Sequence, residues 1–107
     1  MDIEGWRKRI DEVDRKLVEL LNERAQAARE IGRLKNHTNA PIYEPEREKT
    51  IFANVRAANR GPLSDLQLTQ IYERIIDIMR KIQKEEIAPS KAKAVSGETE
   101  LEAGVNE

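Results

Sequence analysis

The sequence predicts an all-α protein, and three observations support this fold class. Apolar residues recur every three or four positions along extended stretches, which is the period of one helix face. Aromatic residues make up only 4% of the 107 residues, so a core must be built from Leu, Ile, Val and Ala, which favour packed helices. The first and longest of these stretches contains no proline. Together these features predict three helices, at about residues 4–36, 45–59 and 64–86.

The first predicted helix is long. Its apolar positions form a seam with heptad spacing and no proline inside it. The seam consists of Ile3, Trp6, Ile10, Val13, Leu17, Leu20, position 24, Ala27, Ile31 and Leu34. Such a helix would extend roughly 50 Å at ~1.5 Å per residue. Gly5 and Gly32 lie near its ends, where glycine costs least, and the turn-forming run "NHTNAP" ends it.

The second and third helices have recognisable ends. Pro45 suits the first turn of the second helix, because its missing N–H would be unpaired there anyway. Gly61 suits a left-handed cap at the end of that helix. The inward residues of the second helix are Ile51, Phe52 and Val55. Ser64 and Gln67 form a capping box that starts the third helix. The apolar positions of the third helix are Leu68, Ile71, Tyr72, Ile75, Ile76, Met79 and Ile82.

Composition and charge indicate the domain organisation and exclude several kinds of partner and site. We expect one helical domain over residues 1–87 and a flexible polar tail or linker over residues 88–107. The net charge of −1 predicts no nucleic-acid partner. With no Cys and a single His37, the sequence predicts no disulfide, thiol nucleophile, metal site or cofactor. No apolar run reaches membrane-spanning length and no signal peptide is visible, which predicts a cytoplasmic protein without membrane contact.

The first helix is too long to be covered by its own chain. Partner helices of about 15 and 23 residues would leave part of a ~50 Å seam exposed. Exposed apolar patches of this kind usually mark partner surfaces. The simplest arrangement is a homodimer in which the long helices cross.

Arg24 is the one charged residue in the seam. Burying its guanidinium without a partner is costly because it stays protonated. Lys35 lies eleven residues further on, so steps of ~100° return it to the same face, with Ala28 and Ile31 between. Two cations on one stripe would hold an anion with separated acceptors, and Arg matches a carboxylate. The alternatives are a buried ion pair or register device for Arg24, and a surface residue that complements the helix dipole for Lys35.

The stretch "PIYEPEREKT" adds further polar candidates. The chain turns back after Lys35, which brings Glu44, Arg47 and Glu48 near it. An arginine is not favoured at a helix start, whereas the helix dipole alone favours glutamates there. Gln83 shares a stripe of the third helix with apolar residues, although a glutamine in such a place is usually peripheral. Together these residues suggest a cationic pocket with one acid and one amide.

Arg7 is a candidate of a different kind. It lies seventeen residues before Arg24, which corresponds to about 25 Å along the helix and ~100° around it. It cannot share the pocket within its own chain, but in an antiparallel dimer it would reach the pocket of the partner chain. The alternative is a surface arginine within the run "RKR".

These residues and their spacing resemble the all-α class of chorismate mutases. The resemblance covers about residues 3–87 and rests on "WRKRIDEVDRKLVELLNERAQAAREIGRLK", "PIYEPERE" and "IIDIMRKIQ". It includes the run D-x-x-L-x-x-L-L-x-x-R that ends at Arg24, then Lys35, the Arg47–Glu48 pair and the late Gln83. It implies an intertwined homodimeric bundle with three helices per chain and two equivalent active sites.

The resemblance also implies roles for the polar residues. Arg24, and Arg7 from the partner chain, would bind the two carboxylates of chorismate. Lys35 and Gln83 would point at its ether oxygen. Glu48 would accept a hydrogen bond from the ring hydroxyl.

Three further positions complete the implied site. Glu44 would lie near the ring hydroxyl, and Arg47 would complete the polar wall. Glu44 stands where a shorter Asp can occur, and Met79 stands where a Ser hydroxyl can help to bind a carboxylate. These two differences would affect substrate affinity more than the chemistry.

The implied reaction is the Claisen rearrangement of chorismate to prephenate in phenylalanine and tyrosine biosynthesis. It moves no proton and forms no covalent intermediate, which agrees with a chain that has no Cys and no Ser–His arrangement. Carboxylate clamps would select a compact conformer, and fixed donors would stabilise charge on the ether oxygen. Two alternative functions remain. One is an isochorismate pyruvate-lyase with the same fold, and the other is a non-catalytic helical dimer that acts as a regulatory or docking module. The polar tail permits either a free-standing enzyme or a piece of a larger one.

Overall fold

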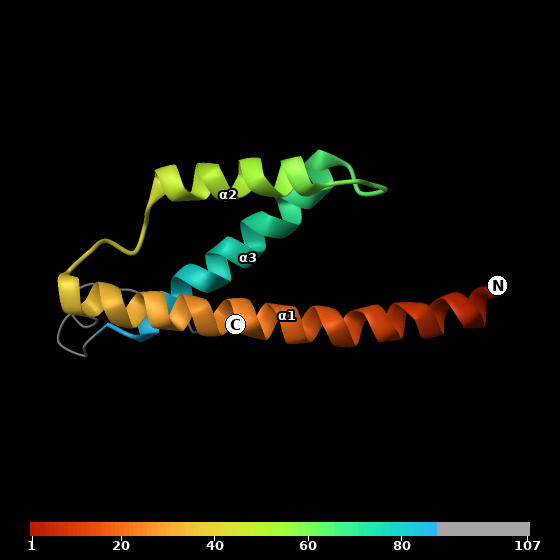
Figure 1. The fold of residues 1–107 in the computed structure, drawn as a ribbon, viewed down its shortest axis with the longest axis horizontal. Coiled ribbons are helices and arrows are strands. Elements are labelled where there is room, and N and C mark those ends of the chain that lie inside the picture. The colour runs from red at the N-terminus through yellow and green to blue at the C-terminus, as the bar shows by residue number, and fades with distance from the viewer. Residues whose placement is uncertain (88–107) are drawn as a thin grey trace, which may run out of the picture.

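The computed structural model describes residues 1–87, and these form three helices and no strand. The helices are α1 (Ile3–Thr38), α2 (Pro45–Ala58) and α3 (Asp65–Glu85), shown in Figure 1. The all-α prediction and its three helices are therefore confirmed. The polar segment 88–107, which the sequence predicts to be a tail or linker, lies outside the described residues.

The ends of α1 are set by local hydrogen bonds. Asp2 caps its start, because the carboxylate accepts a hydrogen bond from the Gly5 N–H at 2.8 Å. At the other end Asn39 adopts a left-handed conformation with φ 59°, and its N–H donates to the Lys35 carbonyl. The helix runs two residues beyond the predicted end at residue 36, because the left-handed Asn39 supplies the stop.

The starts of α2 and α3 are as the sequence predicts. Pro45 occupies the first turn of α2. The capping box of α3 is complete, because the Gln67 N–H donates to the Ser64 hydroxyl and the Ser64 N–H donates to the Gln67 side chain, both at 3.0 Å.

The predicted role of Gly61 as the cap of the second helix is wrong. Helix α2 ends at Ala58, and Asn59 follows it in an extended conformation. Gly61 does adopt a positive φ of 73°, but it lies in the loop beyond. The Asn59 side chain organises this loop, since it donates to the Leu63 carbonyl and to Asp65, each at 2.9 Å, and accepts from the Gly61 N–H.

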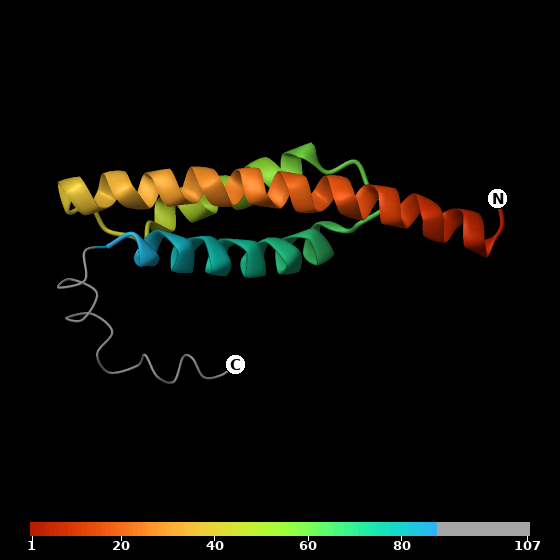
Figure 2. The ribbon, with the colours of Figure 1, turned by 90° about the horizontal axis from the view of Figure 1, so that it is seen from below.

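Helix α3 packs against both other helices, as Figures 1 and 2 show from two directions. It approaches α1 closely at Gly32, where an added Cβ would lie 2.8 Å from the Gln83 Cα and 2.9 Å from the Gln83 carbonyl oxygen. The sequence alone suggests only that Gly32 is tolerated near a helix end. The structure gives it a specific role, because only a residue without Cβ lets the two backbones meet here.

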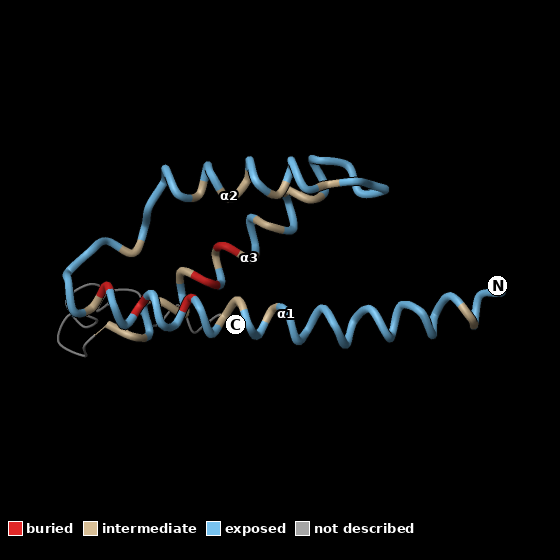
Figure 3. The backbone as a smooth tube through the Cα atoms, viewed as in Figure 1, coloured by how far each residue is buried: buried red, intermediate tan, exposed pale blue. Residues whose placement is uncertain are grey.

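The small core lies where α3 crosses the C-terminal half of α1. Its buried residues are Ala28, Gly32 and Lys35 on α1 and Ile76 and Met79 on α3. Figure 3 shows that burial is confined to this region, while the N-terminal half of α1 extends past the other helices. The apolar seam is exposed there, with Trp6 and Ile10 each 56% exposed. The expectation that this chain leaves part of its seam uncovered is confirmed.

Candidate functional site

A cleft of about 360 Å³ lies between the C-terminal half of α1, the start of α2 and one face of α3. Its charged lining includes four basic residues, Arg24, Lys35, Arg47 and Arg80, and two acids, Glu44 and Glu48. Gln83 adds an amide, and Ala28, Ile31 and Met79 belong to the apolar lining. The predicted stripe on the first helix therefore faces a real cavity, and that cavity is cationic. It holds two acids where the sequence suggests one.

Lys35 lines this cleft and is largely buried. It is only 8% exposed, and its ammonium has three partners. The Nζ donates to the Ile42 carbonyl at 3.2 Å and to the Gln83 Oε1 at 2.9 Å, and forms an ion pair with the Glu44 Oε2 at 2.6 Å. An ammonium has three N–H donors, so these contacts satisfy it fully. The surface alternative for Lys35 is excluded by this burial.

The contact with Lys35 fixes the orientation of the Gln83 amide. A lysine has only donors, so the amide oxygen of Gln83 must face it, and the amide nitrogen must point elsewhere. That nitrogen carries two N–H groups at the wall of the cleft. The close contact at Gly32 holds the backbone of Gln83 against α1. Gln83 is therefore part of the cavity wall and not a peripheral residue.

Arg24 and Arg47 also line the cleft. Arg24 is half-buried, and within residues 1–87 it forms no ion pair or hydrogen bond. An ion pair inside this chain thus does not account for Arg24. Arg47 is exposed in the first turn of α2 and also has no acidic partner among the described residues. Both guanidinium groups keep their donors for an anion, and Arg binds a carboxylate through two parallel hydrogen bonds.

Arg80 is a cleft residue that the sequence analysis missed. Its Nε lies 3.4 Å from the Glu48 Oε2, its Nη2 donates to Asp77 at 3.0 Å, and its guanidinium stacks 5.5 Å from the Tyr43 ring centroid. One signal exists in the sequence, because Arg80 follows Ile76 by four residues and precedes Gln83 by three on the same helix. The pairing with Glu48 depends on how α2 packs on α3, which residue spacing does not reveal.

Arg7 does not line the cleft of its own chain. It lies in the exposed N-terminal half of α1, which extends beyond α2 and α3 in Figures 1 and 2. This agrees with the expectation that Arg7 cannot reach the pocket within one chain.

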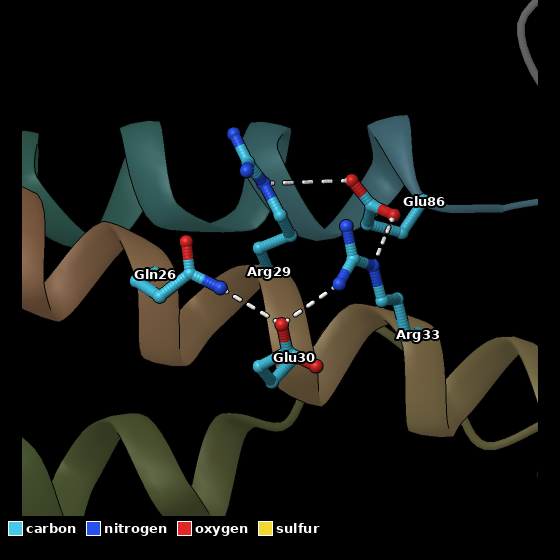
Figure 4. A network of polar contacts seen from close by, with 5 residues as sticks. All are labelled: Gln26, Arg29, Glu30, Arg33 and Glu86. Carbon is cyan, nitrogen blue, oxygen red and sulfur yellow. Dashed lines mark hydrogen bonds and ion pairs between the residues drawn. The ribbon is translucent and has the colours of Figure 1, made fainter.

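A polar network fastens the end of α3 to α1 beside the cleft, as Figure 4 shows. The Glu86 carboxylate accepts a hydrogen bond from the Arg33 Nε at 3.1 Å and pairs with the Arg29 Nε at 3.8 Å. Glu30 connects Arg33 to Gln26, each contact being 2.8 Å. The hydrogen bond to Glu86, followed by the charge of Glu30, raises the pKa of Arg33. Arginine is protonated near neutral pH in both the folded and the unfolded chain, so this shift in the pKa of Arg33 adds no pH dependence to stability there.

Potential metal ligands do not cluster within residues 1–87. No group of three or more His, Cys, Asp or Glu side chains in this part of the chain could hold a metal ion. None of the described helices is long and apolar enough to cross a membrane.

Comparison with known proteins gives the family. Residues 6–84 match the family model described as chorismate mutase type II. The chain is 37% identical over 87 residues to a bifunctional chorismate mutase/prephenate dehydratase of Aquifex aeolicus, covering 78% of this chain and 24% of the relative. It thus spans about a quarter of that longer protein.

Two solved structures are similar over most of their length. The chorismate mutase (form II) of Thermus thermophilus matches with a TM-score of 0.76 and 31% identity, covering 80% of this chain and 98% of the other. The chorismate mutase of Helicobacter pylori in complex with prephenate matches with a TM-score of 0.72 and 32% identity, covering 78% and 91%. By sequence and by fold, the chain belongs to the chorismate mutase type II family.

Proposed function

We propose that this protein converts chorismate to prephenate, the step that commits chorismate to phenylalanine and tyrosine synthesis. The observation that carries the proposal is the pairing of Lys35 with Gln83 in the wall of a cationic cleft, which Arg24 also lines without an ion-pair partner among the described residues. The family supports it, and one relative of similar fold is a chorismate mutase in complex with prephenate.

The reaction suits a site of this kind. In chorismate an enolpyruvyl group is joined to a ring through an ether oxygen. The rearrangement breaks that C–O bond as a C–C bond forms between the two parts, with no atom gained or lost and no proton moved. The enzyme therefore has to hold a flexible dianion in a compact chair-like shape and stabilise negative charge that grows on the ether oxygen.

The cleft residues can divide these tasks between them. The free N–H groups of Gln83 would donate to the ether oxygen, in a region where Lys35 is almost fully shielded from water. Lys35 would also donate to it, by exchanging one of its present acceptors in the protein for that oxygen. Glu44 would keep Lys35 in place through their ion pair. Arg24 would bind one carboxylate.

The remaining residues would shape the pocket around the ring. Glu48 would accept a hydrogen bond from the ring hydroxyl, Arg47 would complete the polar wall, and the buried Met79 would form part of the apolar wall.

A second copy of the chain would complete the site. Trp6, Ile10 and Leu20 are 56–59% exposed along α1, a large apolar area for a protein in water. Pairing two α1 helices in antiparallel fashion would bury this seam. It would also carry Arg7 of each chain towards the cleft of the other, where Arg7 would bind the second carboxylate.

The test is to incubate the purified protein with chorismate, and separately with isochorismate, and to identify the products. The proposal predicts rapid formation of prephenate from chorismate. Pyruvate and salicylate from isochorismate, with little prephenate from chorismate, would instead assign the protein as an isochorismate pyruvate-lyase. Failure to turn over either compound would contradict an enzymatic role and leave a helical module that binds or regulates.

A further inference from the structure

We propose that Arg80 is a positioning residue that holds Glu48 in place for the ring hydroxyl of chorismate. The inference rests on the proposed function, since it concerns the same cleft. The resemblance to the family did not point to Arg80.

Arg80 is anchored on three sides. Its Nη2 donates to Asp77 on the same helix at 3.0 Å, and the Tyr43 ring centroid lies 5.5 Å from its guanidinium carbon. Its Nε faces the Glu48 Oε2 of α2 at 3.4 Å. These contacts leave the guanidinium little freedom, and its side chain is 31% exposed. Arg80 is therefore a fixed charge and not a mobile surface cation.

The contact with Glu48 is the informative one. The Arg80 Nε is buried and has no hydrogen-bond partner among the described residues, although Glu48 lies within ion-pair distance. The positive guanidinium attracts the nearby carboxylate, and a small shift of Glu48 would let its oxygen accept a hydrogen bond from the unpaired Nε–H, which is unfavourable to leave buried without a partner. The Glu48 side chain is only 19% exposed, which limits screening of this attraction by water.

Glu48 also needs to be held. The Arg80–Glu48 pair separates the main cleft from a second hollow of about 340 Å³, which both residues also line. Without the arginine, the carboxylate would lose its ion-pair partner among the described residues and could turn away from the substrate. The other charged residues of the hollow are Glu73 and Asp77, so Arg80 also offsets negative charge that would otherwise repel the Glu48 carboxylate. Arg80 keeps one carboxylate oxygen engaged and leaves the other for the ring hydroxyl.

The structure offers a matched control on the same helix. Arg74 also pairs with Asp77, at 3.6 Å, but its side chain is 67% exposed and it lines neither the cleft nor the hollow. Arg74→Gln removes the same charge as Arg80→Gln without touching Glu48.

The experiment measures kcat/KM for chorismate in Arg80→Gln, Arg74→Gln, Glu48→Gln and the Arg80→Gln/Glu48→Gln double variant. Neighbouring groups that act together commonly couple by an amount equal to a factor of about 10. We expect Arg80→Gln to lower kcat/KM about 10-fold in the natural background and less than about 2-fold when Glu48 is already Gln. Arg74→Gln should have little effect.

A substrate analogue distinguishes a positioning role of Arg80 from a general loss of active-site structure. With chorismate that lacks the ring hydroxyl, Arg80→Gln should react or bind nearly as well as the natural protein, because Glu48 then has no partner. Equal losses with both compounds, or equal losses in both Glu48 backgrounds, would overturn the inference while leaving the mutase function intact. A natural protein that makes no prephenate would overturn the function and the inference with it. Melting temperatures of all variants identify any loss caused by misfolding.

Discussion

The two halves of α1 differ in how much of their surface the rest of the chain covers, although the seam residues Ile31 and Leu34 of the C-terminal half are themselves 44% and 64% exposed. In the C-terminal half, Ala28 is 4% and Lys35 is 8% exposed, because α3 packs against them. In the N-terminal half, Trp6, Ile10 and Leu20 are 56–59% exposed. Figure 3 shows the contrast as a change from buried to exposed along one helix.

This contrast separates what one chain does from what two chains would do. The C-terminal half already forms a cleft with its cations in place. The N-terminal half carries Arg7 and an uncovered seam, which would become useful only against a second copy. We therefore expect changes in either half to abolish activity, but through different measurable steps.

The largest effect is expected from Ile10→Glu, in the N-terminal half. A glutamate in the seam would have to be buried without a partner in the dimer, so the dimer should dissociate and turnover should disappear. Size-exclusion chromatography with light scattering measures the first effect and a chorismate assay the second. Arg15→Glu, on the opposite face of the same stretch, is the control and should remain dimeric. An active monomeric Ile10→Glu protein would show that the cleft needs no second copy.

Lys35→Ala tests the C-terminal half alone. Losing one fixed donor to developing charge typically costs ~3–4 kcal/mol of transition-state stabilisation, so kcat should fall by roughly 10²–10³. Dimer formation and the melting temperature should change much less than kcat. The Glu44 side chain, which pairs with Lys35, is 47% exposed and can be hydrated once the lysine is gone. Unchanged turnover in this variant would contradict the proposed mechanism.

Arg24→Leu tests both halves at once. It makes the seam fully apolar, and it also removes the side chain that would bind a carboxylate. Activity should be lost, and the melting temperature should hold or rise, since Arg24 forms no ion pair in the described chain. A large fall in melting temperature would instead indicate that Arg24 has a structural ion-pair partner in the assembled protein.

The smallest effect concerns stability at Gly32. In Gly32→Ala the new Cβ would meet the backbone of Gln83 at 2.8 Å, and such overpacking costs ~1–3 kcal/mol. Alanine regains ~1 kcal/mol from helix propensity, so a net loss of unfolding free energy is expected. Gly5→Ala is the control, because its Cβ would meet the flexible side chain of Met1, which can move aside. Chemical denaturation of both variants checks this, and a stabilised Gly32→Ala protein would contradict the close helix contact.

The sequence predicts those parts of the molecule that depend on local spacing. The seam, Pro45 and the Ser64 capping box indicate the three helices, and the eleven-residue interval places Arg24 and Lys35 on one face. Features that depend on how the helices pack are not predicted. The Arg80 contact with Glu48 and the backbone contact at Gly32 each need the register of α3 against another helix, which no residue pattern in one chain specifies.

The most direct test of the central claim mixes two inactive proteins. Arg7→Ala and Lys35→Ala variants, unfolded and refolded together in equal amounts, would form mixed dimers. In each mixed dimer one cleft would carry both changes and the other neither, so roughly one quarter of the natural activity should return. Recovery to about that level would mean that Arg7 acts on the cleft of the other chain. A mixture no more active than its components, with mixed dimers verified by mass spectrometry, would contradict the claim.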